Sequence, residues 1–217
     1  MKIYFNSDLC LKERVSKRKY MEKIITSESV SSGHPDKIAD QISDTLLDTH
    51  LMVNSLARTA IETMVTSNNV IIAGEVANAS ISNGDLEHIV RKKLHAIGCE
   101  DPNFHWENVK ITSLLHEQSQ DIAIGIESNG KTDGAGDQGI MYGYATDENK
   151  AFMPAPIYYS HLILRKIMDE VKIGNIPKLG PDAKAQISLI YENNAPIKAQ
   201  SIVVSIQHPD FISQNEV

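Results

Sequence analysis

The stretch Gly33-His34-Pro35-Asp36-Lys37 decides how the first half of the chain folds. Pro35 suits the first position of a helix, where its missing N–H costs nothing. The apolar residues that follow recur every four positions, as on the buried face of a helix, at Ile38, Ile42 and Leu46. A helix is therefore predicted over residues 35–52.

The start of this helix suits a phosphate group. A helix N-terminus offers free N–H groups and the positive end of the helix dipole. This one adds an imidazole at His34, a carboxylate at Asp36 and a cation at Lys37. Taken alone, the pattern is better explained by Asp36 stabilising the dipole, an effect of about 0.3–1 kcal/mol at a surface. The motifs later in the chain favour a binding site instead.

Composition narrows the class of protein. The chain has 217 residues, with 28 acidic and 21 basic side chains and a formal net charge of −7, so nucleic-acid binding is not expected. No apolar run reaches the ~20 residues of a membrane span. Cys10 and Cys99 follow no visible secretion signal and are expected to be reduced thiols in a cytoplasmic protein. Residues 1–21 form a basic extension that is predicted to be disordered.

The first half of the chain reads as a helix followed by a hairpin and a second helix. Residues 58–66 and 70–77 are rich in Thr, Val and Ile and predict two strands. Residues 85–97 predict a helix that Gly98 ends. Residues 109–116 alternate weakly, which favours a further strand.

The second half repeats this order. Residues 155–172 predict a helix, and residues 185–191 and 197–207 predict a hairpin that turns at Asn193-Asn194. Helix followed by hairpin thus occurs twice, which indicates an α+β fold of two similar units. Between them, residues 117–139 are rich in glycine and predict a mobile lid with a tight turn.

Glu62 and Glu75 fall on the two strands of the first predicted hairpin. With a two-residue turn, at Ser67-Asn68 or Asn68-Asn69, both carboxylates share one sheet face, diagonal in the first case and directly opposite in the second. A three-residue turn sends them to opposite faces. On a shared face they repel each other unless a cation or a substrate ammonium compensates. The sequence therefore supports two alternatives equally: Glu62 and Glu75 belong to a binding site, or they are two solvated glutamates of a hairpin.

Two later segments carry further candidates. Asp137 lies at the apex of Gly134–Gly139, where glycines let a ligand approach the backbone, although an ordinary loop tip is the commoner explanation. Lys184, in Asp182-Ala183-Lys184, opens a strand after the turn at Pro181 and is able to point into a site. Neither segment is specific by itself.

One motif is a coincidence. Residues 125–132 fit the G-x-x-x-x-G-K-[ST] phosphate-loop pattern, which requires a helix to begin directly after it. Here Asp133-Gly134-Ala135-Gly136 follows, and such a run does not start a stable helix.

Together the motifs closely resemble the S-adenosylmethionine synthetase family. The resemblance covers residues 22–208, and it is carried by 26–44, Glu62-Thr63, Gly74-Glu75, 134–139, 142–146, 153–156 and 181–184. It implies repeated helix-plus-sheet domains: an N-terminal domain over 22–121, a mobile lid or linker over 122–134, and an incomplete central domain over 135–217. Family members have a third domain, and by this resemblance the chain is expected to stop inside the second.

The resemblance also implies a reaction and its residues. The family joins the sulfur of L-methionine to C5′ of ATP, and the released triphosphate is hydrolysed to phosphate and diphosphate. By resemblance, His34 and Lys184 are catalytic and contact ATP together with Asp182. Methionine is held by Glu75, Gln118 and Asp137. The implied metal sites are Asp36 for Mg²⁺ and Glu62 for K⁺.

Departures from the family keep a second hypothesis open. Two later family segments, which supply cations for the triphosphate and a further magnesium carboxylate, are absent from this chain, and Gln120 stands where the family usually has proline. Family active sites form between subunits, so a homodimer or a dimer of dimers is expected. The alternative to the enzyme is an inactive, truncated remnant that binds ATP–Mg²⁺ or a partner subunit without turnover.

Overall fold

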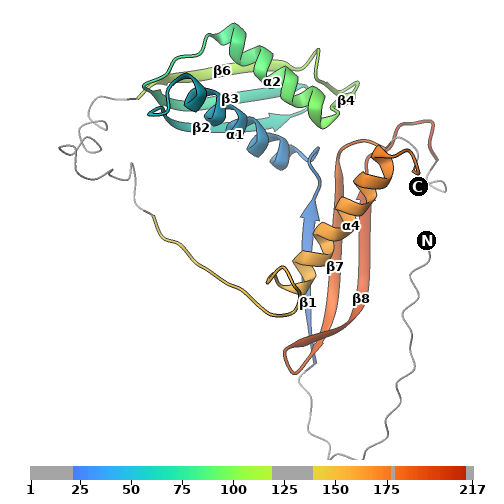
Figure 1. Ribbon diagram of the computed structural model, residues 1–217. Helices are drawn as coiled ribbons and strands as arrows, with labels where there is room; N and C mark the ends of the chain where they lie inside the picture. The colour runs from blue at the N-terminus through green and yellow to red at the C-terminus, as the bar shows by residue number, and fades with distance from the viewer. Residues whose placement is uncertain (1–21, 119–138, 177–178, 214–217) are drawn as a thin grey trace, which may run out of the picture.

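The computed structural model describes residues 22–118, 139–176 and 179–213. Within them the chain forms two three-stranded sheets, with strand orders β2-β3-β6 and β1-β7-β8, each covered by helix on one face (Figure 1). The predicted extension, most of the predicted lid, the phosphate-loop pattern, Gln120 and Asp137 lie outside the described residues. No helix among the described residues is long and apolar enough to cross a membrane.

Helix α1 (Pro35–Val53) begins and packs as its sequence predicts. His34 is the N-cap, with its side chain accepting a hydrogen bond from the backbone N–H of Asp36. The buried positions fall on one face of the helix: Ile38, Ile42, Leu46 and His50. This face lies against strand β2 and helix α2.

The first sheet is built from a hairpin and a crossover. Strands β2 (Arg58–Thr66) and β3 (Asn69–Ala77) are antiparallel around the two-residue turn Ser67-Asn68. Helix α2 (Asn83–Ile97) then carries the chain across the sheet, and Gly98 ends it with a φ of 92°. A crossover of this kind is what parallel pairing requires, and β6 (Lys110–Glu117) pairs with β3 in parallel.

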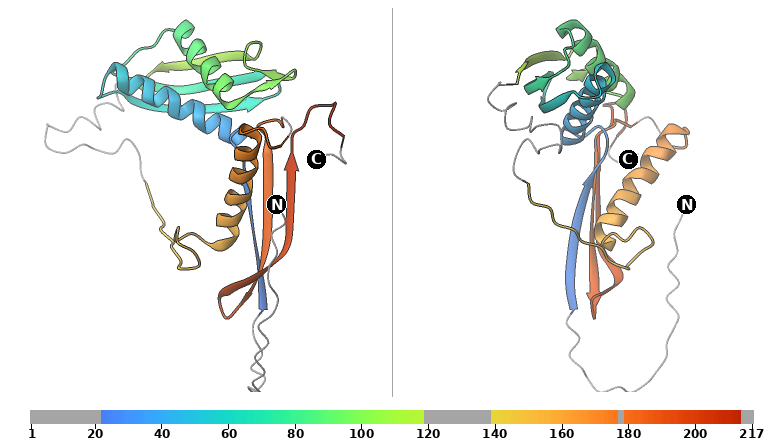
Figure 2. Two further views of the ribbon diagram at one scale, coloured as in Figure 1. Left: turned by 45° about the vertical axis from the view of Figure 1, so that its right-hand side comes forward. Right: turned by 60° about the vertical axis from the view of Figure 1, so that its left-hand side comes forward.

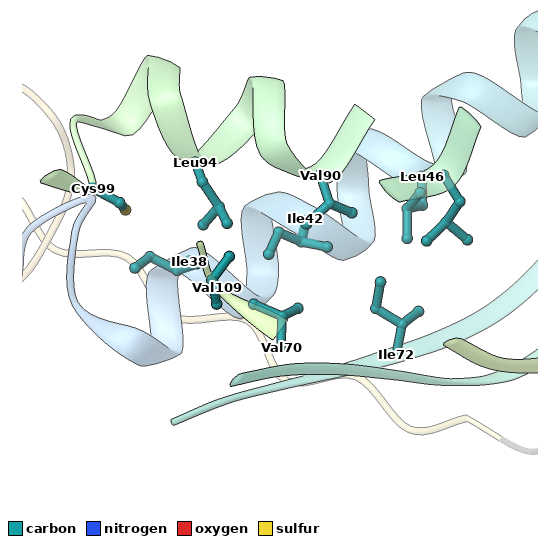
Figure 3. Packing of buried hydrophobic residues seen from close by; sticks show 10 residues of the cluster. Ile38, Ile42, Leu46, Val70, Ile72, Val90, Leu94, Cys99 and Val109 are labelled. Atoms are coloured by element: carbon teal, nitrogen blue, oxygen red, sulfur yellow. The ribbon is translucent and has the colours of Figure 1, made fainter. Parts of the chain in front are cut away.

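The core of this unit lies between helices α1 and α2 and the sheet (Figure 3). In Figure 3 the side chains of Val90 and Leu94 on α2 and Ile42 on α1 point towards Val70 and Ile72 on β3. These residues are almost completely buried. The short strands β4 (Glu100–Asp101) and β5 (Phe104–His105) follow α2 and pair with each other.

The second sheet carries one helix on one face (Figure 2). Helix α4 (Ala155–Lys172) has the predicted bounds. Strands β7 (Ala183–Glu192) and β8 (Ala195–Ile206) form a hairpin around Asn193-Asn194, whose φ values of 52° and 64° suit the tight turn. Helix followed by hairpin therefore occurs twice, as predicted.

Strand β1 (Glu22–Val30) was not predicted as a strand. It pairs antiparallel with β7 along its whole length, from Glu22 opposite Glu192 to Val30 opposite Lys184. The chain then passes directly into α1 of the first unit (Figure 1). Strand β1 therefore belongs to the second sheet, and the short segment after it links that sheet to the first unit. The residue bounds of the two domains stay a prediction.

Glu148 connects the segment before α4 to the second sheet. Its Oε2 accepts hydrogen bonds from the backbone N–H of Ala155 (2.7 Å) and from the hydroxyl of Tyr191 (2.6 Å). Partial burial acts to raise the pKa of Glu148, but the hydrogen bonds from Tyr191 and Ala155 outweigh burial and hold that pKa below its ordinary value. Burial, followed by the hydrogen bond to Glu148, raises the pKa of Tyr191.

Substituting Glu148→Gln is expected to lower the free energy of unfolding by about 0.5–1.5 kcal/mol at neutral pH. Since the folded-state pKa of Glu148 is lowered, its carboxylate stabilises the fold above the unfolded-state pKa, and this stability is lost as the pH falls through the folded-state pKa. Thermal unfolding from neutral to acid pH should show the difference from wild type shrinking. The exposed Glu22→Gln is the control and should differ little at any pH. A Glu148→Gln effect that stays constant with pH contradicts this account.

Candidate functional site

Two of the predicted motifs meet where β1 ends and β7 begins. The backbone N–H of Ser31 donates to the carbonyl of Ala183 (2.9 Å), and that of Gly33 donates to the carbonyl of Pro181 (3.1 Å). The buried Ser31 hydroxyl donates to the Pro181 carbonyl (2.5 Å) and accepts from the backbone N–H of Ala183 (2.7 Å). We call these four hydrogen bonds the β1–β7 junction. It fixes the start of α1 beside the start of β7.

His34 is oriented by its position at the N-terminus of α1. Its Nδ1 accepts the backbone N–H of Asp36 at 3.2 Å, and its side chain is only 13% exposed. A ring nitrogen that accepts a hydrogen bond carries no proton, so neutral His34 holds its proton on Nε2. The ring therefore presents a donor to a ligand while its other nitrogen is held by the helix.

Asp36 occupies the first turn of the same helix and points into solvent, with its side chain 86% exposed. Its Oδ2 lies 3.7 Å from Nδ1 of His34. A single exposed carboxylate suits Mg²⁺, which keeps several waters and is typically bound by one or two carboxylates together with phosphate oxygens. Among the described residues no group of three or more His, Cys, Asp or Glu forms a complete metal site.

Asp182 and Lys184 lie on the other side of the junction. Asp182 Oδ1 is buried without a hydrogen-bond partner among the described residues, and its residue lines a cavity of about 350 Å³ that also reaches Gly33 and Pro35. A buried carboxylate oxygen without a donor is costly unless a ligand satisfies it. The Lys184 ammonium is half-exposed and lies 3.9 Å from Glu28 Oε1, a weak surface pair that leaves it available.

The remaining predicted residues gather on the first sheet. With the turn at Ser67-Asn68, Glu62 pairs with Ala73, so Glu62 and Glu75 share one face and are diagonal neighbours. The first of the two-residue alternatives is therefore the observed one. This face is the one away from α1 and α2, because Thr63 and Ile72 point towards the helices.

Glu75 has a neighbour that was not predicted. His116 stands opposite it in the parallel pairing of β3 and β6, with 3.4 Å between His116 Nε2 and Glu75 Oε1. Gln118 follows β6, where its backbone N–H donates to the carbonyl of Val76 (3.0 Å). Its Oε1 is buried without a partner among the described residues, beside a cavity of about 440 Å³ that Glu117 also lines.

The structure thus brings the predicted site residues into two groups. His34, Asp36, Asp182 and Lys184 surround the β1–β7 junction, and Glu62, Glu75 and Gln118 belong to the first sheet. No hydrogen bond or ion pair connects the groups within the described part of the chain. Ser31 and His116 were not predicted. Ser31 lies inside the matching stretch 26–44, whereas His116 depends on a strand register that local patterns do not reveal.

The two helix-covered sheets, joined through β1, define an α+β protein of repeated helix-plus-sheet units. Residues 22–120 match the family described as S-adenosylmethionine synthetase, N-terminal domain, and residues 132–217 match its central domain. The chain belongs to the S-adenosylmethionine synthetase family, whose members are methionine adenosyltransferases.

Similar proteins agree with this assignment. The chain is 52% identical over 198 residues to an S-adenosylmethionine synthase from Acidiphilium cryptum, covering 89% of this chain and 50% of the relative. It is 50% identical over 191 residues to one from Methylobacterium sp. (86% and 49%), and 47% identical over 195 residues to one from Rhodospirillum centenum (89% and 50%). The chain spans about half the length of these curated relatives.

Proposed function

We propose that this chain acts in the synthesis of S-adenosylmethionine from ATP and L-methionine. The observation that carries the proposal is the β1–β7 junction, which joins two segments about 150 residues apart through backbone hydrogen bonds and the Ser31 hydroxyl. Because of it, an imidazole donor, an ammonium and two carboxylates surround one helix N-terminus. That combination suits a nucleotide triphosphate and its metal ion.

In the proposed reaction, a lone pair of the methionine sulfur attacks C5′ of ATP while the bond from C5′ to the triphosphate oxygen breaks. The sulfur becomes a sulfonium and the triphosphate leaves with the bonding electrons. Water then cleaves the triphosphate to phosphate and diphosphate. No covalent enzyme intermediate is needed, so positioning and electrostatic stabilisation of the leaving group are the means of catalysis.

His34 and Lys184 are the proposed catalytic residues. The Nε2–H of His34 donates a hydrogen bond to the triphosphate near the breaking bond, and the Lys184 ammonium offsets the charge that develops there. The unpartnered Oδ1 of Asp182 accepts a hydrogen bond from ATP. All three roles require the junction to hold its two segments together.

The metal ions are part of the proposal. Asp36 would hold Mg²⁺, which when bound neutralises charge on the phosphate oxygens. Glu62 would contribute to a K⁺ site, although no group of three or more His, Cys, Asp or Glu around it is found among the described residues. We therefore derive no step from potassium.

Methionine is proposed to lie against the first sheet. The Glu75 carboxylate accepts hydrogen bonds from the substrate ammonium. The positive charge of this ammonium also offsets the repulsion between Glu75 and its diagonal neighbour Glu62. The buried Oε1 of Gln118 gains a donor from the same ligand. Asp137 is proposed as a third contact and lies outside the described residues.

We also propose a homodimer, or a dimer of dimers, and a cytoplasmic setting in which ATP and methionine are available. No helix among the described residues covers the face of the first sheet that carries Glu62, and this face exposes Met64 and Leu114. Exposed apolar side chains on a sheet face favour an interface. Pairing there brings the glutamates of one subunit towards its partner.

The alternative is that the chain binds ATP–Mg²⁺ or a partner subunit without turnover. The observation that favours it is that the described residues hold no group of three or more His, Cys, Asp or Glu that would complete a metal site. By resemblance, further cations for the triphosphate come from family segments outside the residues matched here.

The test of both proposals is an assay for S-adenosylmethionine by mass spectrometry, with purified chain, ATP, methionine, Mg²⁺ and K⁺. His34→Ser keeps an N-cap side chain but removes the imidazole, so it should lower product formation by about 10²–10³-fold without unfolding α1. The matched control is His88→Ser, which changes an exposed histidine on α2.

Three outcomes separate the proposals. Product that falls in His34→Ser and persists in His88→Ser supports synthesis. Absence of product, with ATP–Mg²⁺ binding that His34→Ser weakens, supports binding without turnover. A chain that neither forms product nor binds ATP–Mg²⁺ contradicts both.

A further inference from the structure

A groove of about 340 Å³ lies between the end of β1 and helix α4. Its polar lining comes from serines at the end of β1 and the loop after it, and from two side chains of α4, His161 and Arg165. Leu164 and Met168 provide apolar lining. The volume is at the lower end of the range of about 300–1,000 Å³ that is typical of small-ligand sites.

The groove adjoins the β1–β7 junction through Ser31, but the side chains proposed to contact the nucleotide do not line it. Along β7 the side chains alternate between the two sheet faces, and Ala183 and Ala185 pack in the cluster with Leu164 of α4. Lys184 therefore points to the opposite face of the sheet, away from α4. Lys184, His34 and Asp182 do not line the groove.

The histidine in this groove is held in place. The hydroxyl of Ser29 and Nδ1 of His161 are 2.6 Å apart, which links β1 to α4. When the serine donates, the proton of the neutral ring is on Nε2, which makes no hydrogen bond to any described residue. His161 then presents a fixed N–H donor beside the groove.

Two positive charges, Lys37 and Arg165, act on this histidine, and no carboxylate among the described residues is found to offset them there. Arg165 follows His161 by one helical turn, and its guanidinium forms no ion pair with a described residue, including Asp169 one turn further on. Burial, then the positive charges of Lys37 and Arg165, lower the pKa of His161. By contrast, Arg91 and Lys166 each pair with a glutamate one turn along their helix, Glu87 and Glu170.

We propose that this groove binds a phosphate-type oxyanion. The donors are the Arg165 guanidinium, the His161 Nε2–H and the hydroxyl of Ser32, for which no partner is found in the described part of the chain. Lys37 adds charge from the first turn of α1. Guanidinium groups bind tetrahedral oxyanions through paired, charge-assisted hydrogen bonds, and serine hydroxyls and imidazole complete the set. The proposal does not depend on ATP binding at the β1–β7 junction.

The test is a titration of the ¹⁵N-labelled full chain with inorganic phosphate at constant ionic strength, followed by NMR at the His161 ring and the Arg165 Nε–H. Constant ionic strength separates binding from general screening. Saturable shifts are expected at both groups. In Arg165→Gln, the His161 shifts should show binding weakened about tenfold, since one charge-assisted interaction is lost.

Two control variants make the result specific. Lys166→Gln removes the same charge from the next position of α4, outside the groove, and Lys184→Gln removes a cation from the other sheet face. Phosphate affinity at His161 should stay unchanged in both, and Arg165→Gln should melt like wild type because Arg165 is exposed.

Four results overturn the proposal: no saturable shift at His161, shifts confined to residues 34–36 and 182–184, equal weakening in Lys166→Gln, or full affinity in Arg165→Gln. The second result places the anion at the junction alone. Loss of ATP binding in the His34→Ser variant is a separate readout, so failure of the proposed function and failure of this groove are distinguishable.

Discussion

Replacing Leu46 by alanine is expected to lower the free energy of unfolding by about 2–5 kcal/mol. Leu46 is completely buried in the first core, where α1 and α2 cover the sheet (Figure 3). The truncation removes apolar contact and leaves a cavity that rigid neighbours fill only in part, so both terms act in the same direction. Urea unfolding followed by circular dichroism measures the change.

The next residue provides the control. Leu47 has the same side chain on the same helix but is 37% exposed, so Leu47→Ala removes little buried area and should cost well under half as much. Equal losses in the two variants contradict the packing of α1 on its sheet. The comparison cancels the helix propensity of alanine, which is common to both substitutions.

Helices and hairpins were predictable because their signals are local. α4 has the predicted bounds, since Pro154 precedes it and Gly174, with a φ of 80°, follows its end. The second hairpin turns at Asn193-Asn194 because asparagine accepts the left-handed region that a tight turn needs. In each case the residues that fix the element lie within it or beside it.

Strand pairing over long distances was not predictable. β1 is mostly polar, with five exposed positions, and it becomes a strand by pairing with β7 about 160 residues later in the chain. The pairing of Glu75 with His116 likewise depends on the parallel register of β3 and β6, which joins residues about 40 positions apart in the chain. A single sequence, considered without an alignment, contains no periodic pattern that predicts either contact.

The candidate site was predictable in its residue types and only partly in its arrangement. His34 was expected at the start of a helix, where it lies. For Glu62 and Glu75 the sequence left open whether they share a sheet face or lie on opposite faces, and the register places them on a shared face. The role of Ser31 was missed because a serine in a polar loop resembles many solvated serines. Its importance comes from Pro181 and Ala183, which only the fold brings to it.

The junction itself is expected to fail in Gly33→Ala. A Cβ at Gly33 would lie 2.5 Å from the backbone carbon of Pro181 and 2.6 Å from its carbonyl oxygen, far below any ordinary contact. Backbone cannot rotate away as a flexible side chain does, so the two segments must separate. Overpacking of this kind destabilises by about 1–3 kcal/mol, and the hydrogen bond from Gly33 to Pro181 is strained at the same time.

Separation of the segments should also weaken ATP–Mg²⁺ binding, if the proposed function is correct. His34 follows Gly33 directly and Lys184 follows Pro181 by three residues, so a shift at the contact moves both donors relative to each other. A misplacement of about 1 Å in a catalytic arrangement costs about 10²-fold in rate. Calorimetric titration with ATP–Mg²⁺, thermal unfolding and the S-adenosylmethionine assay, all on the same variant, measure its affinity, its stability and its rate.

Gly84→Ala is the matched control, because the nearest atom to its Cβ, the Ser82 hydroxyl oxygen, is 3.9 Å away and Gly84 lies in the first turn of α2. Alanine there should be neutral or stabilise the helix by up to about 1 kcal/mol. If Gly33→Ala loses stability but keeps ATP–Mg²⁺ affinity, the junction supports the fold and the nucleotide lies elsewhere. If it keeps both, Pro181 moves freely and the close contact at Gly33 does not determine how the two segments meet.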